Sequence, residues 1–404
     1  MAVAISNRST NRLMDITKRV AQQIRTVERL LDAYQRAARV PLTRFLTGFY
    51  KQNRQMGSRD RRMASRLAYH YFRLGRAARQ SAVPVRLAMA EFLCSEESAI
   101  AQMLLPDLYP AIRSPLEEKI ALLESHTPFR LEDVLPFQAR LSAGIDRQAF
   151  TKSLFVQPDL FIRLRPLYAD QVIAALEGAG IAHRRLDEFA VALPNSTALD
   201  RIEGIAGKYE IQDYSSQRTG TFFEASPGES WWDACAGAGG KSLLLLDNNP
   251  GINLLVSDIR NSILRNLDER FETAGIRAYR RKIIDLTKGT AAILGSEQFD
   301  GIILDVPCSG AGTWGRTPEM ISAVDERDIE RFASLQRQLA AVAVQHLKPG
   351  KPMIYITCSV FAEENEQVVA HLQQLRHLRV ARMEAIQGYR HRADSLFAAR
   401  LVAV

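Results

Sequence analysis

Two of the four cysteines in this 404-residue chain stand directly after apolar runs that are typical of buried strands. Cys308 ends the segment GIILDVPC, residues 301–308, and Cys358 ends the segment MIYITC, residues 353–358. The carboxyl ends of parallel strands meet at one edge of a sheet, where a bound substrate can reach them. A lone cysteine is best interpreted as a small buried apolar residue. Two thiols placed in this way predict nucleophilic thiol chemistry instead.

A glycine-rich segment follows another apolar strand and precedes a helix. Residues 233–242 read DACAGAGGKS, in which three glycines in four positions let the backbone turn sharply and approach a ligand. The segment is not a G-x-x-x-x-G-K-[ST] phosphate loop, and it is not a clean G-x-G-x-x-G. We expect these loop residues to bind a cofactor: Cys235, Ala236, Gly237, Ala238, Gly239, Gly240 and Lys241.

Four acidic residues end successive predicted strands, and they are Asp233, Asp258, Asp285 and Asp305. Asp258 lies one strand–helix step after the loop, where a carboxylate can accept two hydrogen bonds from a ribose diol. For each acid alone, capping or turn formation at a strand end is an equally good interpretation. The ordered set favours a nucleoside-binding rim, and we assign Asp258, Asp285 and Asp305 to the cofactor site.

The elements that must position these residues form an α/β fold. From residue 229 onward, strand and helix patterns alternate, which predicts a parallel, doubly wound, Rossmann-like sheet. Strands at 159–165 and 189–193 around a helix at 169–179, with a short helix at 199–206, indicate a small α+β module. Helical periodicity at 13–34, 42–50 and 58–74, followed by proline-broken helices, indicates an all-α start. The predicted domains are residues 1–145, 146–225 and 226–404.

The charge is concentrated at the N-terminus. Residues 1–80 hold 18 Lys and Arg against 4 Asp and Glu, a net charge of +14, so the rest of the +8 chain carries −6. This asymmetry favours a nucleic-acid-binding domain joined to a catalytic one. A solvated arginine-rich surface and an organelle transit peptide are the alternatives. The basic pattern continues to Arg79, well past a typical presequence, which favours the folded domain.

Composition excludes several other classes of protein. No apolar run reaches membrane-spanning length, and no C-x-x-C pair supports a zinc site. His183 and His346 have no partners at metal-ligand spacing, so we expect no metal. Four cysteines without a disulfide framework indicate a reducing compartment, the cytoplasm. We expect a monomer in which Cys94 is structural, and Trp231 and Trp232 pack in the core.

The ordered motifs resemble those of the S-adenosylmethionine (SAM)-dependent RNA cytosine-C5 methyltransferases of the Sun/Fmu (RsmB/NOP) type. The resemblance covers about residues 155–404, and residues 1–145 are loosely similar to a NusB-type RNA-binding domain. Three positions depart from the family pattern without removing a catalytic group: Ala238 for proline, Glu319 for aspartate and Ser395 for glycine. The segments that carry the resemblance are residues 212–217, 233–242, 305–313, 316–319, 357–359, 363–366 and 394–399, together with Asp258 and Asp285.

The resemblance implies a chemistry that needs both thiols. Cys358 would add to C6 of cytosine, and Cys308 would assist release of the covalent adduct. Asp305 would hydrogen-bond the edge of the base, and Lys241 could assist electrostatically if the fold brings it close. SAM would be the cofactor and RNA the substrate, with ribosomal RNA favoured and transfer RNA as the alternative. The target base must leave its stack to admit attack above the ring.

Two other functions remain open from the sequence. A non-catalytic RNA-binding assembly factor that retains the fold would be favoured by an eroded glycine loop or a missing cysteine, and neither is seen. A DNA cytosine methyltransferase would take its nucleophile from the Pro-Cys motif and carry a separate target-recognition region. Arg163 and Arg165 alternate along one strand, where phosphate contact and simple solvation are equally good interpretations.

Overall fold

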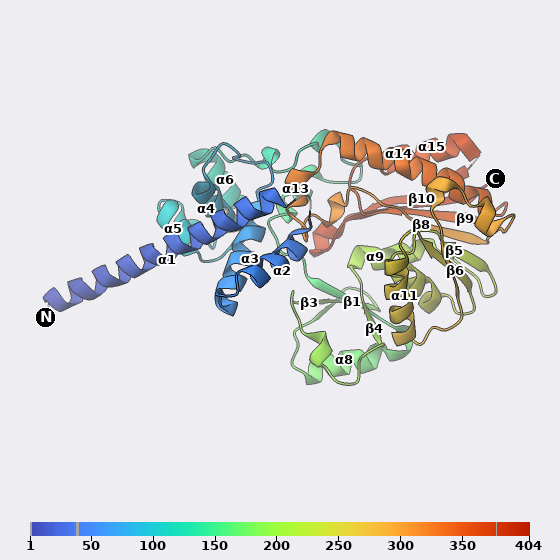
Figure 1. Cartoon of the computed structure of the whole chain (residues 1–404), viewed down its shortest axis with the longest axis horizontal. Coiled ribbons are helices and arrows are strands. Elements are labelled where there is room, and N and C mark those ends of the chain that lie inside the picture. The colour runs from blue at the N-terminus through green and yellow to red at the C-terminus, as the bar shows by residue number, and fades with distance from the viewer. Residues whose placement is uncertain (1, 38–39, 377) are drawn as a thin grey trace. The chain divides into compact units, whose positions relative to one another are not determined.

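The computed structural model describes residues 2–37, 40–376 and 378–404 (Figure 1). The chain forms two compact units. The helical unit contains Met1–Gln138, Arg147–Val156 and Trp314–Val324, and the sheet unit contains Ala139–Asp146, Gln157–Thr313 and Asp325–Val404. Three segments therefore belong to a different unit from their sequence neighbours, namely 139–146, 147–156 and 314–324. The three-part division at residues 145 and 225 stays a prediction.

The helical unit confirms the helical N-terminal region. The predicted first three helices are α1 (Ala2–Arg36), α2 (Leu42–Gln52) and α3 (Ser58–Arg73). Val20 and Val27 of α1 pack against Leu67 of α3 and Leu87 of the next helix, because apolar residues at three- and four-residue steps share one helix face. The unit's other α-helices are α4 (Val83–Cys94), α5 (Ala99–Leu104), α6 (Leu116–His126), α7 (Arg147–Ser153) and α13 (Met320–Ala323).

A small antiparallel sheet opens the sheet unit. Its order is β2-β3-β1-β4, and its strands are β2 (Arg184–Arg185), β3 (Ala190–Leu193), β1 (Leu160–Leu164) and β4 (Tyr209–Ile211). Helix α8 (Ala169–Gly178) covers it through Val172 and Leu176. The predicted helix at 199–206 is wrong, since only a 3₁₀ turn, Leu199–Arg201, forms before Gly204 takes φ of 78°.

Arg163 and Arg165 have neither of the roles considered from sequence. Both guanidinium groups bind the buried carboxylate of Asp247, with nitrogen–oxygen distances of 2.6 Å and 3.0 Å. Asp247 lies on α10 (Gly240–Asn248), which belongs to the larger sheet. These ion pairs therefore join the small sheet to the larger one within the sheet unit.

The larger sheet has seven strands in the order β10-β11-β9-β8-β5-β6-β7. The five strands from β9 to β7 run parallel, as predicted, but β11 runs antiparallel to both β9 and β10. The sheet is therefore mixed, with the predicted parallel strands extended at one edge by two antiparallel strands. Its strands are β5 (Ser230–Asp233), β6 (Asn253–Asp258), β7 (Arg280–Ile283), β8 (Gly301–Asp305), β9 (Pro352–Thr357), β10 (Leu378–Ile386) and β11 (Leu396–Ala403).

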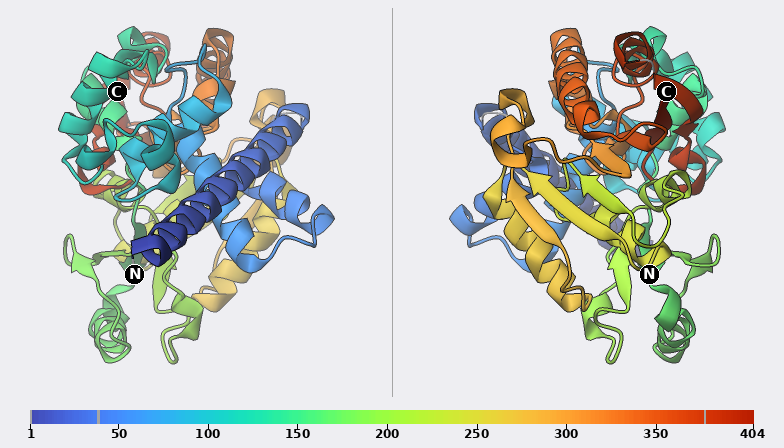
Figure 2. Two further views of the ribbon diagram at one scale, coloured as in Figure 1. Left: turned by 90° about the vertical axis from the view of Figure 1, so that its left-hand side faces the viewer. Right: turned by 90° about the vertical axis from the view of Figure 1, so that its right-hand side faces the viewer.

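Helices cover both faces of this sheet (Figure 2). Side chains alternate along a strand, so adjacent Trp231 and Trp232 of β5 lie in two different cores. The Trp231 core includes residues of α10 and α11 (Asn261–Thr273), and the Trp232 core includes residues of α14 (Glu326–Ala343) and α15 (Glu366–Arg376). Both indoles are fully buried, which confirms that they are packing residues. The remaining helices of the unit are α9 (Tyr214–Arg218) and the short α12 (Ala291–Leu294).

Gly301 at the start of β8 allows Trp231 to pack flat against the sheet. A Cβ atom at this position would lie 2.3 Å from the indole ring. We therefore expect Gly301→Ala to destabilise the fold by about 1–3 kcal/mol, the usual cost of overpacking a core. Thermal unfolding followed by circular dichroism measures this, with Gly178→Ala as the control, because an added Cβ there meets nothing within 4 Å. Equal midpoints for the two variants would contradict the packing argument.

Candidate active site

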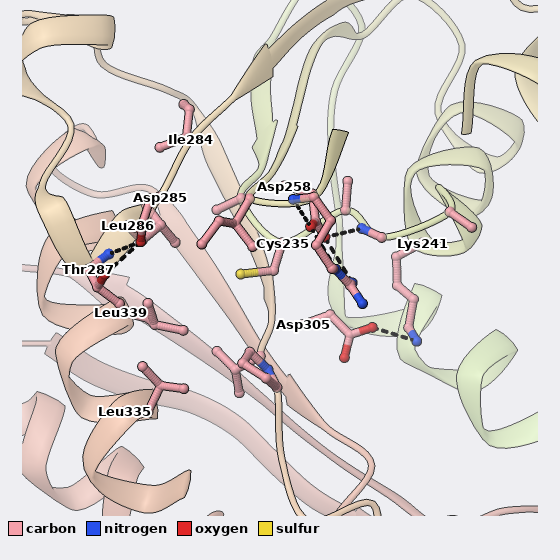
Figure 3. Close-up of a pocket in the computed structure, with 18 of the residues that line it drawn as sticks. Cys235, Lys241, Asp258, Ile284, Asp285, Leu286, Thr287, Asp305, Leu335 and Leu339 are labelled. Atoms are coloured by element: carbon pink, nitrogen blue, oxygen red, sulfur yellow. Dashed lines mark hydrogen bonds and ion pairs between the residues drawn. The ribbon is translucent and has the colours of Figure 1, made fainter. Parts of the chain in front are cut away.

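The carboxyl ends of four parallel strands of the larger sheet surround a pocket of about 600 Å³ (Figure 3). The volume lies in the range of small-molecule sites, and the position beyond the strand ends is where doubly wound sheets bind ligands. Almost every predicted cofactor residue lines it. Its walls are formed by residues 234–238, 240, 241, 258–260, 284–287, 305–307, 335 and 339.

The glycine loop is held by the neighbouring strand. The amide of Ala236 donates to the carbonyl of Ser257 at 2.9 Å, and the amide of Gly237 donates to Asp258 at 3.1 Å. Gly237 has φ of 52°, and a Cβ there would meet nothing within 4 Å, so bare backbone faces the pocket. Gly239 does not line the pocket. It precedes α10 with φ of 81°, and a Cβ there would lie 2.8 Å from Leu267.

Asp258 is a buried carboxylate at the tip of β6 whose oxygens face the pocket loop. Besides the Gly237 amide, it accepts hydrogen bonds from the Arg260 amide at 2.8 Å and from the Arg260 guanidinium at 3.1 Å and 3.3 Å. The Arg260 side chain is 63% exposed, so a ligand can displace its guanidinium at little cost. The carboxylate is thereby available for a diol.

Two of the other acids have local partners. Asp285 lines the pocket and accepts from the amide and hydroxyl of Thr287 at 3.0 Å and 2.6 Å, and the hydroxyl hydrogen bond is the main cause of its lowered pKa. It therefore caps the short 3₁₀ turn that follows β7. Asp233 is buried and accepts from the Ser242 hydroxyl at 2.6 Å, and burial raises the pKa of Asp233 to about 7. Its contact is to the start of α10.

Asp305 and Lys241 form an ion pair of 2.8 Å, and Figure 3 shows the two side chains facing each other. Burial would lower the pKa of Lys241, but Asp305 and, more weakly, the thiol of Cys358 outweigh it and raise that pKa. The ammonium group therefore stays charged in the neighbourhood of Cys358. This arrangement meets the condition under which Lys241 was expected to assist electrostatically.

The two predicted catalytic thiols lie together. The sulfur atoms of Cys308 and Cys358 are 3.1 Å apart. The hydrogen bond to Cys358, followed by burial, raises the pKa of Cys308 well above its ordinary value. Cys308 therefore keeps its proton near neutral pH.

A buried carboxylate that the sequence analysis left without a role bridges the loops that carry these thiols. Glu364 accepts from the amide of Ser309, which follows Cys308, at 2.8 Å. Its other oxygen accepts from the hydroxyl of Ser359, which follows Cys358, at 2.7 Å. Glu364 has no exposed surface, and burial raises its pKa. The acidic stretch 363–366 was the available sequence signal, but no pattern within it singles out Glu364.

Backbone packing fixes the same two loops. The amide of Gly312 donates to the carbonyl of Cys358 at 2.9 Å, and the amide of Ser395 donates to the carbonyl of Gly312 at 2.9 Å. A Cβ at position 312 would lie 1.8 Å from the Ser395 carbonyl oxygen, so only glycine allows this approach.

The remaining predicted residues occupy varied sites. The four cysteines form no disulfide, and burial raises the pKa of both Cys235 and Cys94. His183 bonds the carbonyl of Ile181, and His346 lies between Thr290 and the carbonyl of Glu297. Within the described ranges, no group of three His, Cys, Asp or Glu residues is arranged to hold a metal ion. None of the described helices is long and apolar enough to cross a bilayer.

This sheet order, with a pocket beyond the ends of its parallel strands, is that of the α/β methyltransferase fold. Residues 221–400 match the family model described as 16S rRNA methyltransferase RsmB/F. The match covers less than half of the chain, so the RsmB/F family is what this part of the chain is similar to. The resemblance seen in the sequence is confirmed.

Curated relatives match over about half of the chain. The ribosomal RNA small subunit methyltransferase B of Enterobacter sp. (strain 638) is 31% identical over 220 residues, which are 53% of this chain and 51% of that protein. The protein of the same name from Shewanella oneidensis is 33% identical over 214 residues, 50% of this chain and 48% of that protein. The chain thus spans about half the length of the curated relatives it matches.

Solved structures share the fold. The crystal structure of PH0851 has a TM-score of 0.70 at 20% identity, covering 94% of this chain and 98% of that one. The structure of NSun6 from Pyrococcus horikoshii with SFG has a TM-score of 0.56 at 17% identity, covering 64% of this chain and 94% of that one. At these identities the likeness confirms the α/β methyltransferase architecture alone.

The pocket residues fit the cofactor of this family. The apolar side chains of Ile259, Leu286 and Leu339 can enclose a purine, and the Asp258 carboxylate suits a ribose diol. The open backbone at Gly237 leaves room for a close approach.

If Asp258 holds the ribose, Asp258→Asn should weaken SAM binding at least about tenfold, because a neutral amide replaces two charge-assisted hydrogen bonds. Isothermal titration of the full chain with SAM measures this. The amide oxygen of the substituted side chain can still accept from the Gly237 amide, so the loop should keep its position. Asp268→Asn on α11 removes the same charge outside the pocket and serves as the control. Equal affinities for the two variants would refute the ribose contact.

The bridge formed by Glu364 predicts a positioning role. Glu364→Ala should lower kcat for RNA methylation at least about tenfold with little change in KM for SAM, since it leaves buried donors of both cysteine loops unpaired. Glu364→Gln keeps one acceptor oxygen and should restore part of kcat.

The control for this prediction is the neighbouring Glu363→Ala, because Glu363 pairs with Arg140 at 3.5 Å. Steady-state kinetics and thermal unfolding are measured together. A loss of kcat that follows the unfolding midpoint across all three variants would contradict a positioning role.

Proposed function

We propose that this protein is an RNA cytosine-C5 methyltransferase that acts on ribosomal RNA through a covalent bond between Cys358 and C6 of the target cytidine. The observation that carries the proposal is the 3.1 Å separation of the Cys308 and Cys358 sulfurs beside the cofactor pocket. Ribosomal RNA is favoured because the curated relatives are named ribosomal RNA small subunit methyltransferase B. Transfer RNA is the alternative substrate.

The two thiols answer a specific chemical problem. Cytosine C5 is a poor nucleophile until a thiolate adds to C6 and makes C5 enamine-like. Bound SAM supplies an electrophilic methyl group on its sulfonium. C5 would then form the new carbon–carbon bond as the sulfur–methyl bond of the sulfonium breaks and leaves a neutral thioether. The C5 proton then leaves to a base, and the carbon–sulfur bond at C6 breaks to return the thiolate. Each electron pair is accounted for without a metal or redox partner.

The asymmetry of the thiol pair supports different roles for its members. The hydrogen bond with Cys358 is the largest cause of the raised pKa of Cys308, which makes Cys308 a poor nucleophile and leaves that role to Cys358. Once Cys358 is bonded to C6, this cause of the raised pKa at Cys308 is removed. Cys308 can then lose its proton and serve as the base in the release step.

Asp305 and Lys241 suit the recognition of the base. A carboxylate can accept from the exocyclic amine of cytosine, and Asp305 is half-buried at the tip of β8 three residues before Cys308. Lys241 fixes this carboxylate at 2.8 Å and supplies positive charge for the attacking thiolate. The target base must reach these groups out of its stack.

The helical N-terminal region is proposed to bind the RNA. Its net charge of +14 over residues 1–80 attracts the phosphates of RNA whatever their base sequence. Because the four cysteines are free thiols, we place the protein in a reducing compartment, the cytoplasm. We also propose that it is a monomer.

Methyl transfer tests the proposal directly. The full chain, incubated with methyl-labelled SAM and separate transcripts of small-subunit ribosomal RNA and transfer RNA, should label the ribosomal transcript. Bisulfite sequencing of RNA from cells with and without this chain then locates the cytidine. RNA binding without transfer to any RNA would favour the non-catalytic assembly factor instead.

The two cysteines predict opposite phenotypes. Cys358→Ser should reduce methyl transfer by at least about a thousandfold, because the nucleophile is lost. Cys308→Ser should still form the bond to C6 but release it slowly, leaving a protein–RNA adduct. Denaturing gels with labelled RNA measure the adduct.

Cys94→Ser is the control for both variants, since Cys94 lies in the helical unit. It should neither trap RNA nor lose activity. An adduct with Cys358→Ser, or none with Cys308→Ser, would overturn the assignment of roles.

A further inference from the structure

A second cavity of about 600 Å³ lies within the helical unit, between α1, the turn after α2 and the start of α3. Figures 1 and 2 show α1 running beside these two helices. Its lining is mainly basic and amide side chains, with one acid. The lining residues are Arg19, Gln22, Gln23, Thr26, Arg29, Gln55, Met56, Arg59, Asp60 and Met63. We call this cavity the arginine groove.

One face of α1 supplies half of the groove. Arg19, Gln22, Gln23, Thr26 and Arg29 recur at steps of three and four residues, which places them along one stripe of the helix. The opposite stripe of α1 packs into the core of the unit. Helix α1 is therefore amphipathic, and its polar face lines the groove.

The arginines of this unit fall into two groups. Several are committed to internal partners: Arg66 binds Glu91 at 2.7 Å, Arg61 binds the Met56 carbonyl at 2.8 Å, and Arg86 binds the Gly75 carbonyl at 3.0 Å. By contrast, several exposed arginine side chains make no hydrogen bond or ion pair within the part of the chain that the structure describes. Three of these arginines line the groove, namely Arg19, Arg29 and Arg59, and others lie outside it, such as Arg44, Arg54 and Arg62.

The neighbouring cavity carries no net charge of this kind. It shares Arg19 and Gln23 with the groove, and Arg66 adds a second cation. Glu91 and Glu97 also line it, so its charges cancel. The arginine groove has three cations against the single carboxylate of Asp60. A net positive hollow without internal counter-ions attracts an anion from outside the chain.

We propose that the arginine groove holds the sugar–phosphate backbone of the RNA substrate, an inference that rests on the proposed function and locates its RNA contact. Guanidinium groups match phosphate oxygens through their planar fork, and glutamine amides donate to phosphate and ribose. A single-stranded segment suits the groove, since the partly exposed side chain of Met63 offers an apolar surface for an unstacked ribose or base.

The test is the salt dependence of RNA binding by the full chain. The triple variant Arg19→Ala, Arg29→Ala, Arg59→Ala should bind a labelled single-stranded RNA at least about tenfold more weakly in fluorescence anisotropy at low salt. The slope of log affinity against log salt should fall by about 2, since each phosphate contact on a single strand contributes about 0.7. Arg44→Ala, an exposed arginine of α2 outside the groove, is the control.

The outcomes separate this inference from the proposed function. Weaker binding and a lower slope in the triple variant, with a higher KM for RNA and an unchanged kcat, support the groove. If no RNA is ever methylated but the slope still falls, the groove stands and the methyltransferase proposal fails. Equal affinity and slope for the triple variant and Arg44→Ala overturn the groove. Unchanged RNA binding with lost binding of polyglutamate would assign it to an acidic partner protein.

Discussion

The geometry of the candidate site depends on one buried carboxylate. Glu364 accepts from Ser309 and Ser359, so a single side chain ties together the loops that follow β8 and β9. Gln336 of α14 donates to the same carboxylate at 3.0 Å, which fixes the helix against both loops. A buried charge is stable only when its hydrogen bonds are satisfied, so the bridge constrains everything attached to it. The thiols are held by this constraint.

The electrostatics of the site follow from that placement. The sulfurs are 3.1 Å apart, and this hydrogen bond is the largest cause of the raised pKa of Cys308. Lys241 remains cationic because Asp305 lies 2.8 Å away. A thiol pair and an ion pair therefore lie at the same edge of the sheet. The pocket proposed for the cofactor lies beside this edge of the sheet and is lined by residues 305–307.

Local sequence patterns predicted most elements, because apolar periodicity reports directly which face of a helix or strand is buried. They failed where tertiary partners decide. The two-residue β2 has no periodicity to detect, and the reversed direction of β11 is set by its neighbours β9 and β10. The helix expected at 199–206 does not form, because only a 3₁₀ turn, Leu199–Arg201, precedes the positive φ of Gly204. Arg163 and Arg165 were read as surface residues, although both bind the distant Asp247.

The sequence by itself determined the chemistry available to this protein: two thiols at strand ends, a glycine loop, a series of acids and a basic N-terminus. Side-chain type and short-range spacing carry that information. Only the tertiary structure decided how these groups differ from one another. It placed Asp285 in a turn and Asp258 against the loop, and it gave Glu364 two loops to join. Distances between residues far apart in sequence set these differences, because burial and charge act through space.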